Sequence, residues 1–465
     1  MDPVLKQHEK DEPLTPSLST EAVQTEVERI LASDKFARSK RLRSLLQFTV
    51  SQTLEGHADL LKEYVIGTEV LHKPDNYDPR RDSLVRVLAS RLRIKLKEYY
   101  NDGGSEDPLV IEFPKGKYVP RFQRREHLQT EVQKKLRARH ASSRGRFLLH
   151  RATEPNLAEA VQRFEEAAKA EADWPTPHVE LSTAAALQGF LGYARPREIW
   201  PLVRSQAEAA LEMDDMSADA HIALGMFHAF FAWRWRDAES HFRKAIERDS
   251  YSGTGHLWLA LGSLLPFGKV RETGDELTKA RQFAPTPFLE DGQLLALYLS
   301  GRHDELIRQT ENTRDPSATA PSLGPEWRTW LRGCALAAAG RIPEAIDLLR
   351  TIENPGARVI ATLGHCYGVA QDADRAREMR ARLEARRQSG AWVPNYDRAL
   401  IAAGLGESEG AMGLIQEACR ENEPWMVFLS LDPRLGSLRA IPRFGGFIRR
   451  VMAIENSEGN LNGGA

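Results

Sequence analysis

The stretch AESHFRKAIERDS, residues Ala238–Ser250, decides the fold, because its pattern returns at a fixed interval. Two further copies flank it, SQAEAALEMDD (Ser205–Asp215) and GDELTKARQFAP (Gly274–Pro285). When the copies are aligned on a shared alanine, Ala210, Ala245 and Ala280 lie 35 residues apart. A helical pattern that repeats at this interval, with a turn residue after each copy, is typical of stacked helical hairpins. The sequence therefore predicts an α-helical solenoid.

The same Ala-x3-Phe-x2-Ala pattern also occurs earlier, at Ala160, Phe164 and Ala167. Looser copies follow later in the chain, such as CALAAAGRIPEAIDLLR. A period near 34 with Ala, Phe, Ala and a closing Pro or Asp resembles the tetratricopeptide repeat. The resemblance implies a solenoid over residues 147–455, in which the small residues pack where paired helices approach closely.

A last hydrophobic run, EPWMVFLSLDPRLGSLRAIPRFGGFIRRV (Glu423–Val451), follows the final copy. It resembles the closing segment of bacterial tetratricopeptide proteins that sit behind a DNA-binding domain. The resemblance implies that this run acts as a cap and covers the last hydrophobic edge of the array.

A second region, DSLVRVLASRLRIKLKEYY (Asp82–Tyr100), predicts one amphipathic helix that is unusually basic. Its apolar side chains form a stripe at spacings of four and three, namely Leu84, Leu88, Leu92, Leu96 and Tyr99. Its basic side chains are Arg86, Arg91, Arg93, Lys95 and Lys97. We expect three of them, Arg86, Arg93 and Lys97, to share one face. A face of this kind is either a solvated surface or a site for an anionic partner.

A β-hairpin is predicted directly after this helix, in PLVIEFPKGKYVPRF. Two β-type runs, residues 109–113 and 118–122, enclose a turn with Gly at its tip. Lys115 and Lys117 stand at or beside that turn. Helical patterns upstream of the basic helix complete the order helix, helix, basic helix, hairpin. This is the order of a winged helix-turn-helix, in which the third helix enters the major groove of DNA.

The N-terminal region also resembles the OmpR/PhoB type of winged helix. The Val-x-Val-x-x-x-Arg-Leu-Arg-x-Lys-Leu pattern of that family's recognition helix is matched by Val85, Val87, Arg91, Leu92, Arg93, Lys95 and Leu96. The wing departs from the family because its second Gly is missing, and no receiver domain precedes the motif. The resemblance implies binding of double-stranded DNA through the basic residues of the helix and through Lys115 and Lys117.

These patterns divide the chain into five segments. We expect a disordered tail (1–20), a winged helix-turn-helix domain (21–123), a basic linker (124–146), the solenoid (147–455) and a second tail (456–465). The linker is very polar and shows almost no apolar periodicity. We therefore expect it to be exposed and to pack into neither core.

Charge and motifs narrow the range of functions. The formal net charge is -1, yet residues 35–146 hold 25 Lys and Arg against 14 Asp and Glu. Three distant cysteines favour a reduced, cytoplasmic protein. No signal peptide and no membrane span is expected, and no phosphate-binding loop, metal-binding motif or nucleophile elbow occurs. We expect no enzymatic activity, no cofactor and no metal site.

The combined interpretation is a bacterial transcriptional regulator, mainly α, with a winged helix joined to a tetratricopeptide-repeat solenoid. The winged helix would bind DNA, and the concave groove of the solenoid would bind a protein or peptide partner or a small effector. The alternative hypothesis is a non-enzymatic interaction scaffold, in which the winged helix binds protein and no DNA is contacted.

Overall fold

The computed structural model describes residues 18–150, 152–283, 286–311, 322–323 and 326–453. Contacts between Cα atoms divide the chain into two compact units, Met1–Lys134 and Lys135–Ala465. We call them unit 1 and unit 2. Each has its own hydrophobic core.

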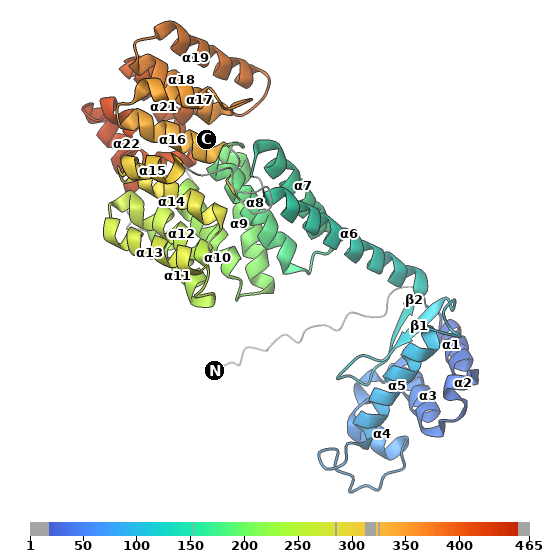
Figure 1. Ribbon diagram of the computed structural model, residues 1–465. Helices are drawn as coiled ribbons and strands as arrows, with labels where there is room; N and C mark the ends of the chain where they lie inside the picture. The colour runs from blue at the N-terminus through green and yellow to red at the C-terminus, as the bar shows by residue number, and fades with distance from the viewer. Residues whose placement is uncertain (1–17, 151, 284–285, 312–321, 324–325, 454–465) are drawn as a thin grey trace, which may run out of the picture. The chain divides into compact units, whose positions relative to one another are not determined.

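Unit 1 consists of helices followed by a two-stranded antiparallel sheet (Figure 1). Its elements are α1 (Thr20–Ala32), α2 (Asp34–Ala37), α3 (Lys40–Leu54), the short turn η1 (Ala58–Leu60), α4 (Glu63–Glu69), α5 (Leu84–Tyr100), β1 (Leu109–Glu112) and β2 (Arg121–Arg124). Helices α2, α3 and α4 all contact α5, and β1 contacts both α1 and α5. The basic helix is therefore the element around which this unit is assembled.

The predicted apolar stripe of the basic helix is confirmed. Leu88, Leu92, Leu96 and Tyr99 are all buried in the core of unit 1, whereas Leu84 is only partly buried. The hairpin is also present, with Leu109 paired to Arg124 and Glu112 to Arg121. Its second strand begins three residues later than predicted, after Pro120. Proline lacks the N–H that a strand donates to its partner, so ladder pairing starts beyond it.

A buried carboxyl joins three elements of unit 1. The Tyr100 hydroxyl of α5 donates to Glu26 Oε1 of α1 at 3.0 Å, and the Ile111 amide of β1 donates to the same hydroxyl at 2.8 Å. The Glu26 side chain is fully buried. Burial, with a further contribution from the nearby Asp107, raises the pKa of Glu26 to about 7 from its ordinary value of 4.5.

This shift in pKa predicts the pH dependence of unit 1. A carboxyl with a raised pKa stabilises the fold fully below its unfolded value, and the stability is lost as pH rises through about 7. We expect unit 1 to lose on the order of 2–3 kcal/mol between pH 4.5 and pH 8. Glu26→Gln should remove most of this dependence, and the exposed Glu28→Gln on the same helix should not. Amide hydrogen exchange in α1 and α5, corrected for intrinsic rates, measures the effect; equal pH dependence in all three proteins would contradict it.

Unit 2 is built almost entirely from helices. They are α6 (Arg125–Leu149), α7 (Glu154–Ala170), α8 (Pro175–Phe190), α9 (Pro196–Met213), α10 (Ala218–Phe227), η2 (His228–Ala232), α11 (Trp235–Arg248), α12 (Gly253–Leu259), η3 (Ala260–Leu264), η4 (Leu265–Phe267), α13 (Val270–Phe283), α14 (Pro287–Leu299), α15 (His303–Glu311), α16 (Trp327–Ala338), α17 (Ile342–Leu349), α18 (Ala357–Val369), α19 (Ala373–Gln388), α20 (Asn395–Gly404), α21 (Ser408–Arg420), η5 (Pro424–Phe428), η6 (Pro433–Leu438) and α22 (Pro442–Met452). Helix α6 begins in unit 1 and ends in unit 2.

The predicted solenoid is present in unit 2. Consecutive helices from α8 to α21 pair into hairpins, and the first helices of successive hairpins contact each other in series. The repeated Ala210, Ala245 and Ala280 are fully buried on the second helices. The repeated Phe needs a small partner: a Cβ on Gly225 of α10 would lie only 2.4 Å from the ring of Phe242 on α11. Unit 2 is thus an α-solenoid of stacked helical hairpins.

Helix α6 corrects the expectation for residues 124–146. These residues were expected to pack into neither core, but the second half of α6 packs against α7 and α8. Ala138 is fully buried, and the Ser142 hydroxyl donates to Glu180 at 2.5 Å. Gly145 lies against the ring of Phe164, as Gly225 does against its own Phe. Because the buried face consists of Ala, Ser and Gly, it leaves no hydrophobic period in the sequence.

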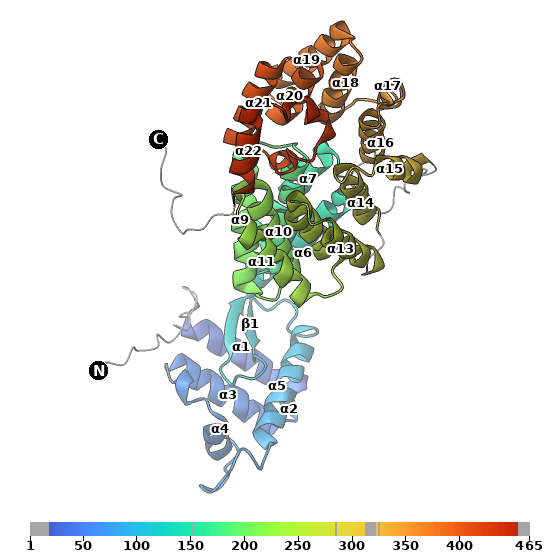
Figure 2. The ribbon, with the colours of Figure 1, turned by 90° about the vertical axis from the view of Figure 1, so that its left-hand side faces the viewer.

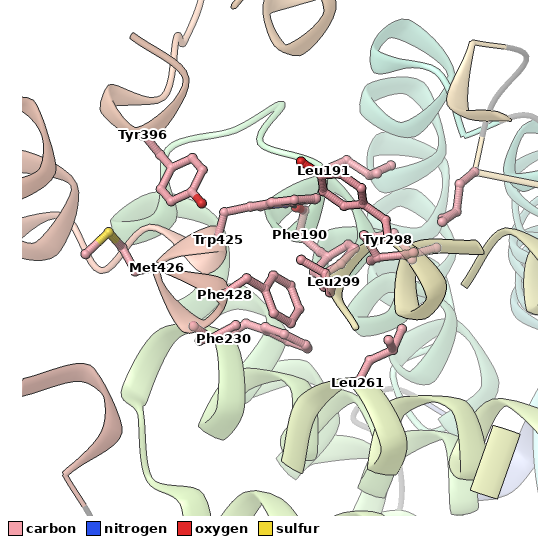
Figure 3. Packing of buried hydrophobic residues seen from close by; sticks show 14 of the residues in the cluster. Phe190, Leu191, Phe230, Leu261, Tyr298, Leu299, Tyr396, Trp425, Met426 and Phe428 are labelled. Carbon is pink, nitrogen blue, oxygen red and sulfur yellow. Dashed lines mark hydrogen bonds between the residues drawn. The ribbon is translucent and has the colours of Figure 1, made fainter. Parts of the chain in front are cut away.

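The C-terminal run corrects a second expectation, because residues 424–438 do not cover only the last edge of the array. We call these residues the plug. Trp425 and Phe428 of the plug lie against Phe190 of α8 and Phe230 of η2, with ring centroids 6.1 Å and 6.2 Å apart (Figure 3). The Trp425 indole N–H also donates to the Phe190 carbonyl at 3.0 Å. The plug therefore fills the face lined by the first helices of the hairpins.

Helix α22 continues from the plug and returns to the early repeats. Figure 2 shows it in red beside the green helices that follow α8. The Trp235 indole N–H at the start of α11 donates to the Val451 carbonyl at 2.8 Å. The end of the solenoid is thus connected to its beginning.

An ion pair lies at the centre of the plug. The Arg434 guanidinium donates to both oxygens of Asp432, with Nε 3.0 Å and Nη2 2.7 Å away, and both side chains are almost fully buried. The hydroxyls of Tyr298 in α14 and Tyr396 in α20 donate to the same carboxylate at 3.0 Å and 2.9 Å. Burial alone would raise the pKa of Asp432, but Arg434 outweighs it and the pKa lies below its ordinary value.

Breaking this ion pair should destabilise unit 2 strongly. Asp432→Asn keeps the volume but leaves the Arg434 charge buried without a counter-ion, and such a loss typically costs about 3–5 kcal/mol. Replacing both residues, with Asp432→Asn and Arg434→Met, should recover part of that loss because no charge is then buried. Urea unfolding followed by tryptophan fluorescence reports on this unit, since all nine Trp follow residue 146. A loss below about 1 kcal/mol would contradict the central role of the pair.

Candidate functional site

The solvent side of α5 carries both basic and apolar side chains. Arg91 and Lys97 are exposed, and so are Val87 and Ile94, whose exposed fractions are 42% and 56%. Positions 87, 91 and 94 follow each other at spacings of four and three, so they lie on one face of the helix. Neither Arg91 nor Lys97 forms an ion pair or hydrogen bond with another described residue through its side chain.

Three other predicted site residues are engaged within unit 1. Arg86 lies 3.5 Å from Glu63 and donates to the Pro79 carbonyl at 3.1 Å. Lys95 pairs with Glu98 on the next turn of the helix at 2.5 Å. The half-buried Arg93 donates from Nε to the Pro114 carbonyl at 3.3 Å, which joins α5 to the start of the hairpin turn. Arg86, Arg93 and Lys97 lie on one side of α5, seven and four residues apart. Two of them are held by contacts within unit 1, and only Lys97 has no such contact with a described residue.

The two lysines of the hairpin lie where the sequence placed them. The amide of Lys117 closes the turn onto the Pro114 carbonyl at 3.4 Å, and Gly116 between the lysines has a φ of 80°. This left-handed conformation favours glycine. Both Lys115 and Lys117 are exposed. Because Arg93 holds Pro114, the basic turn lies next to α5.

This contact distinguishes the role of Arg93 from that of its neighbours. Arg93→Ala should remove one hydrogen bond between α5 and the turn, at about 0.5–1.5 kcal/mol, and should speed amide exchange in the hairpin. Leu92→Ala, which truncates a fully buried side chain, should instead cost about 2–5 kcal/mol and affect the whole unit. Exchange rates in β1 and β2 and in α3 separate the two effects. Unchanged hairpin exchange in the Arg93 variant would show that the contact is not formed.

A second candidate site is a cavity of about 220 Å³ in unit 2. It is lined by aromatic side chains and by charged groups from four helices, among them Tyr193, Trp327, Trp392, Glu154, Arg358, Arg386 and Asp397. Arg386 of α19 donates to Glu154 of α7, so these two charges are paired with each other. Burial raises the pKa of Tyr193 to about 12.

Arg358 and Asp397 differ from that pair, because neither side chain has a hydrogen bond or ion pair with another described residue. Arg358 stacks on Trp425, with its guanidinium carbon 4.1 Å from the ring centroid, and its Nε is buried without a partner. The Asp397 side chain has an exposed fraction of only 5%, and burial raises its pKa. Sequence analysis missed both residues, since they stand 39 positions apart in helices of ordinary pattern.

The described residues contain no group of three or more His, Cys, Asp or Glu that could hold a metal ion. The three cysteines are free and buried, as expected. No helix in the described part of the chain is long and apolar enough to cross a membrane.

Comparisons with known proteins find similarity only among solved structures. No protein-family model matches the sequence, and no curated protein matches it. A human IFIT1 dimer with m7Gppp-AAAA is 15% identical, covers 93% of this chain and 95% of its own, and gives a TM-score of 0.43. Yeast Tom70 is 12% identical over 92% and 90% of the two chains, with a TM-score of 0.34. The TPR domain of P58(IPK) is 13% identical over 89% and 98%, with a TM-score of 0.22. The repeat assignment rests on the packing inside this chain.

Proposed function

We propose that this chain is a non-enzymatic DNA-binding regulator whose unit 1 contacts duplex DNA through α5. The observation that carries the proposal is the exposed face on which Arg91 and Lys97 accompany Val87 and Ile94. In the major groove, Arg binds the edge of guanine with two hydrogen bonds, and apolar side chains contact the methyl group of thymine. A single helix face with both kinds of side chain has the chemistry to read bases.

The basic hairpin turn supports the same proposal. Lys115 and Lys117 are exposed beside α5, where they would contact phosphates and fix the orientation of the helix. The order of α3, α4, α5 and the hairpin agrees with a winged helix. The excess of positive charge over residues 35–146 supplies attraction to any duplex, independent of its sequence.

The position of the plug changes where a regulatory partner would bind. A peptide lying along the face of the first helices would have to displace Trp425 and Phe428, which are buried there. The outer surface and the cavity near Arg358 do not require this displacement. We therefore place partner binding outside the filled groove.

A second candidate function is a protein-interaction scaffold. The exposed Val87 and Ile94 favour it as well, because exposed apolar side chains also mark protein contacts. Val132 and Leu136 of α6 are exposed in the same way. In this case α5 would bind a protein, and binding to random duplex DNA at low salt would not be measurable.

DNA binding by the full chain tests the proposal directly. Arg91→Ala combined with Lys97→Ala should weaken specific binding by about 1–3 kcal/mol and lower the slope of log affinity against log salt by about 1–2. The matched control is Arg281→Ala combined with Arg350→Ala, two exposed basic positions of unit 2. It should leave both quantities unchanged. Fluorescence anisotropy across a salt series gives both values.

Two outcomes would count against DNA binding. Unchanged affinity in the α5 variant, with helical content intact, would remove this face from the interface. The absence of any binding by the unmodified chain at low salt would favour the scaffold. The α5 variant should lose affinity for DNA but keep its stability. An unfolding temperature equal to that of the unmodified chain shows that the variant still folds.

A further inference from the structure

The cavity of unit 2 is lined by two charged side chains that the protein leaves without partners, the buried Asp397 and the partly buried Arg358. Burying a charge is costly unless it is paired and hydrogen-bonded, and most buried charges in proteins are paired. In unit 2 the Asp432 and Arg434 side chains follow this rule closely. Arg358 and Asp397 do not, and both line the same cavity. Two exceptions in one place point to a binding function.

The surroundings of Arg358 fix its position without satisfying its donors. Its guanidinium carbon lies 4.1 Å from the ring centroid of Trp425 and 5.4 Å from that of Trp330, so aromatic rings hold its plane. Stacking of this kind leaves the N–H groups in the plane available for an acceptor. A guanidinium with a fixed plane is suited to bind a carboxylate through two parallel hydrogen bonds.

Asp397 provides the opposite charge at the same cavity. No ion pair joins Asp397 to Arg358. Each is nevertheless the strongest charged influence on the pKa of the other. Both side chains line the same cavity without forming an ion pair, so a molecule in the cavity that carries both an acceptor and a cationic donor can contact both of them.

The other residues that line the cavity indicate the size and the apolar character of that molecule. Leu191, Trp327 and Trp392 supply an apolar and aromatic wall. The volume of about 220 Å³ exceeds the roughly 150 Å³ that holds a benzene molecule in an engineered protein cavity. It is too small for a nucleotide with its phosphates or for a folded peptide segment.

We propose that this cavity binds a free α-amino acid with an aromatic or branched apolar side chain. Its carboxylate is held by Arg358 and its ammonium by Asp397, and its side chain lies among the aromatic residues. A molecule with only one of the two charges leaves the other group of the cavity unpaired, and that costs affinity. This site goes beyond the DNA-binding function and does not depend on it.

Three small molecules of nearly equal size test the proposal on the full chain. L-phenylalanine carries both charges, 3-phenylpropanoate lacks the ammonium, and 2-phenylethylamine lacks the carboxylate. We expect L-phenylalanine to bind at least about tenfold more tightly than either analogue, a difference of about 1.4 kcal/mol. Tryptophan fluorescence and the shift in unfolding temperature both report binding, since Trp327, Trp330 and Trp392 line the cavity.

Two variants test separately whether Asp397 binds the ammonium and Arg358 the carboxylate of the ligand. Asp397→Asn should weaken the binding of L-phenylalanine at least about tenfold. It should not weaken the binding of 3-phenylpropanoate, because the variant removes a charge that this molecule leaves unpaired. Arg358→Lys keeps the charge but loses the planar pair of donors. It should weaken the binding of both molecules that carry a carboxylate, L-phenylalanine and 3-phenylpropanoate. The matched controls are Asp374→Asn, an exposed acid of α19, and Arg332→Gln, a half-buried arginine that pairs with Glu311 away from the cavity. Both should bind L-phenylalanine like the unmodified chain.

Several results would overturn the proposal. The first is that none of the three molecules binds up to about 10 mM, and the second is that all three bind equally through apolar contacts. Tighter binding of the dipeptide L-phenylalanylglycine than of L-phenylalanine would show that the cavity receives a peptide end. If Asp397→Asn weakens 3-phenylpropanoate as much as L-phenylalanine, Asp397 acts only through the fold. None of these results changes the expected DNA binding.

Discussion

The fold of unit 2 depends on one buried ion pair, Asp432 with Arg434. A solenoid is normally held by contacts between neighbouring repeats only. Here a carboxylate accepts hydrogen bonds from Arg434, Tyr298 and Tyr396, which come from the plug, from α14 and from α20. The third guanidinium nitrogen, Nη1, donates to the Thr362 hydroxyl of α18 at 2.9 Å. The desolvation cost of the two charges is offset because both carboxylate oxygens accept hydrogen bonds and all three guanidinium nitrogens donate one.

This anchor explains how the plug can occupy the inner face of the array. Trp425 and Phe428 add aromatic contacts to α8 and η2. The ion pair between Asp432 and Arg434 holds the later residues of the plug in place. The inner face thereby becomes a core, and the groove that repeat proteins usually offer is no longer open. What stays accessible is a small chamber with Arg358 at its wall, where the stacked Trp425 belongs to the plug itself. Trp425 therefore takes part both in filling the inner face of the array and in the proposed ligand site.

Sequence reasoning succeeds here where the signal is local and periodic. Ala245 with Phe242 marks the hairpins, and Leu92 marks the buried side of the basic helix, because both follow helical spacing. It fails for α6, because the residues on its packed side, such as Ala138 and Gly145, have side chains too small to give a hydrophobic pattern in the sequence. It also fails for pairings between distant segments. No spacing along the chain predicts that Trp425 lies against Phe190, since that contact exists only after the array has formed. Arg358 and Asp397 stand on the first helices of successive hairpins, but nothing in their spacing indicates that their side chains line one cavity.

The bond between Trp425 and the Phe190 carbonyl has a consequence for the synthesis of the chain. It joins residues 235 positions apart, so α8 leaves the ribosome long before its partner is made. During that interval the apolar side chains of the early repeats have no cover, and transient exposure of this kind promotes aggregation. Contacts so distant in sequence also raise the contact order of a helical protein, which otherwise folds quickly through local pairings. We expect the final compaction of unit 2 to occur only after translation has passed the plug, in a step slower than the formation of its individual hairpins.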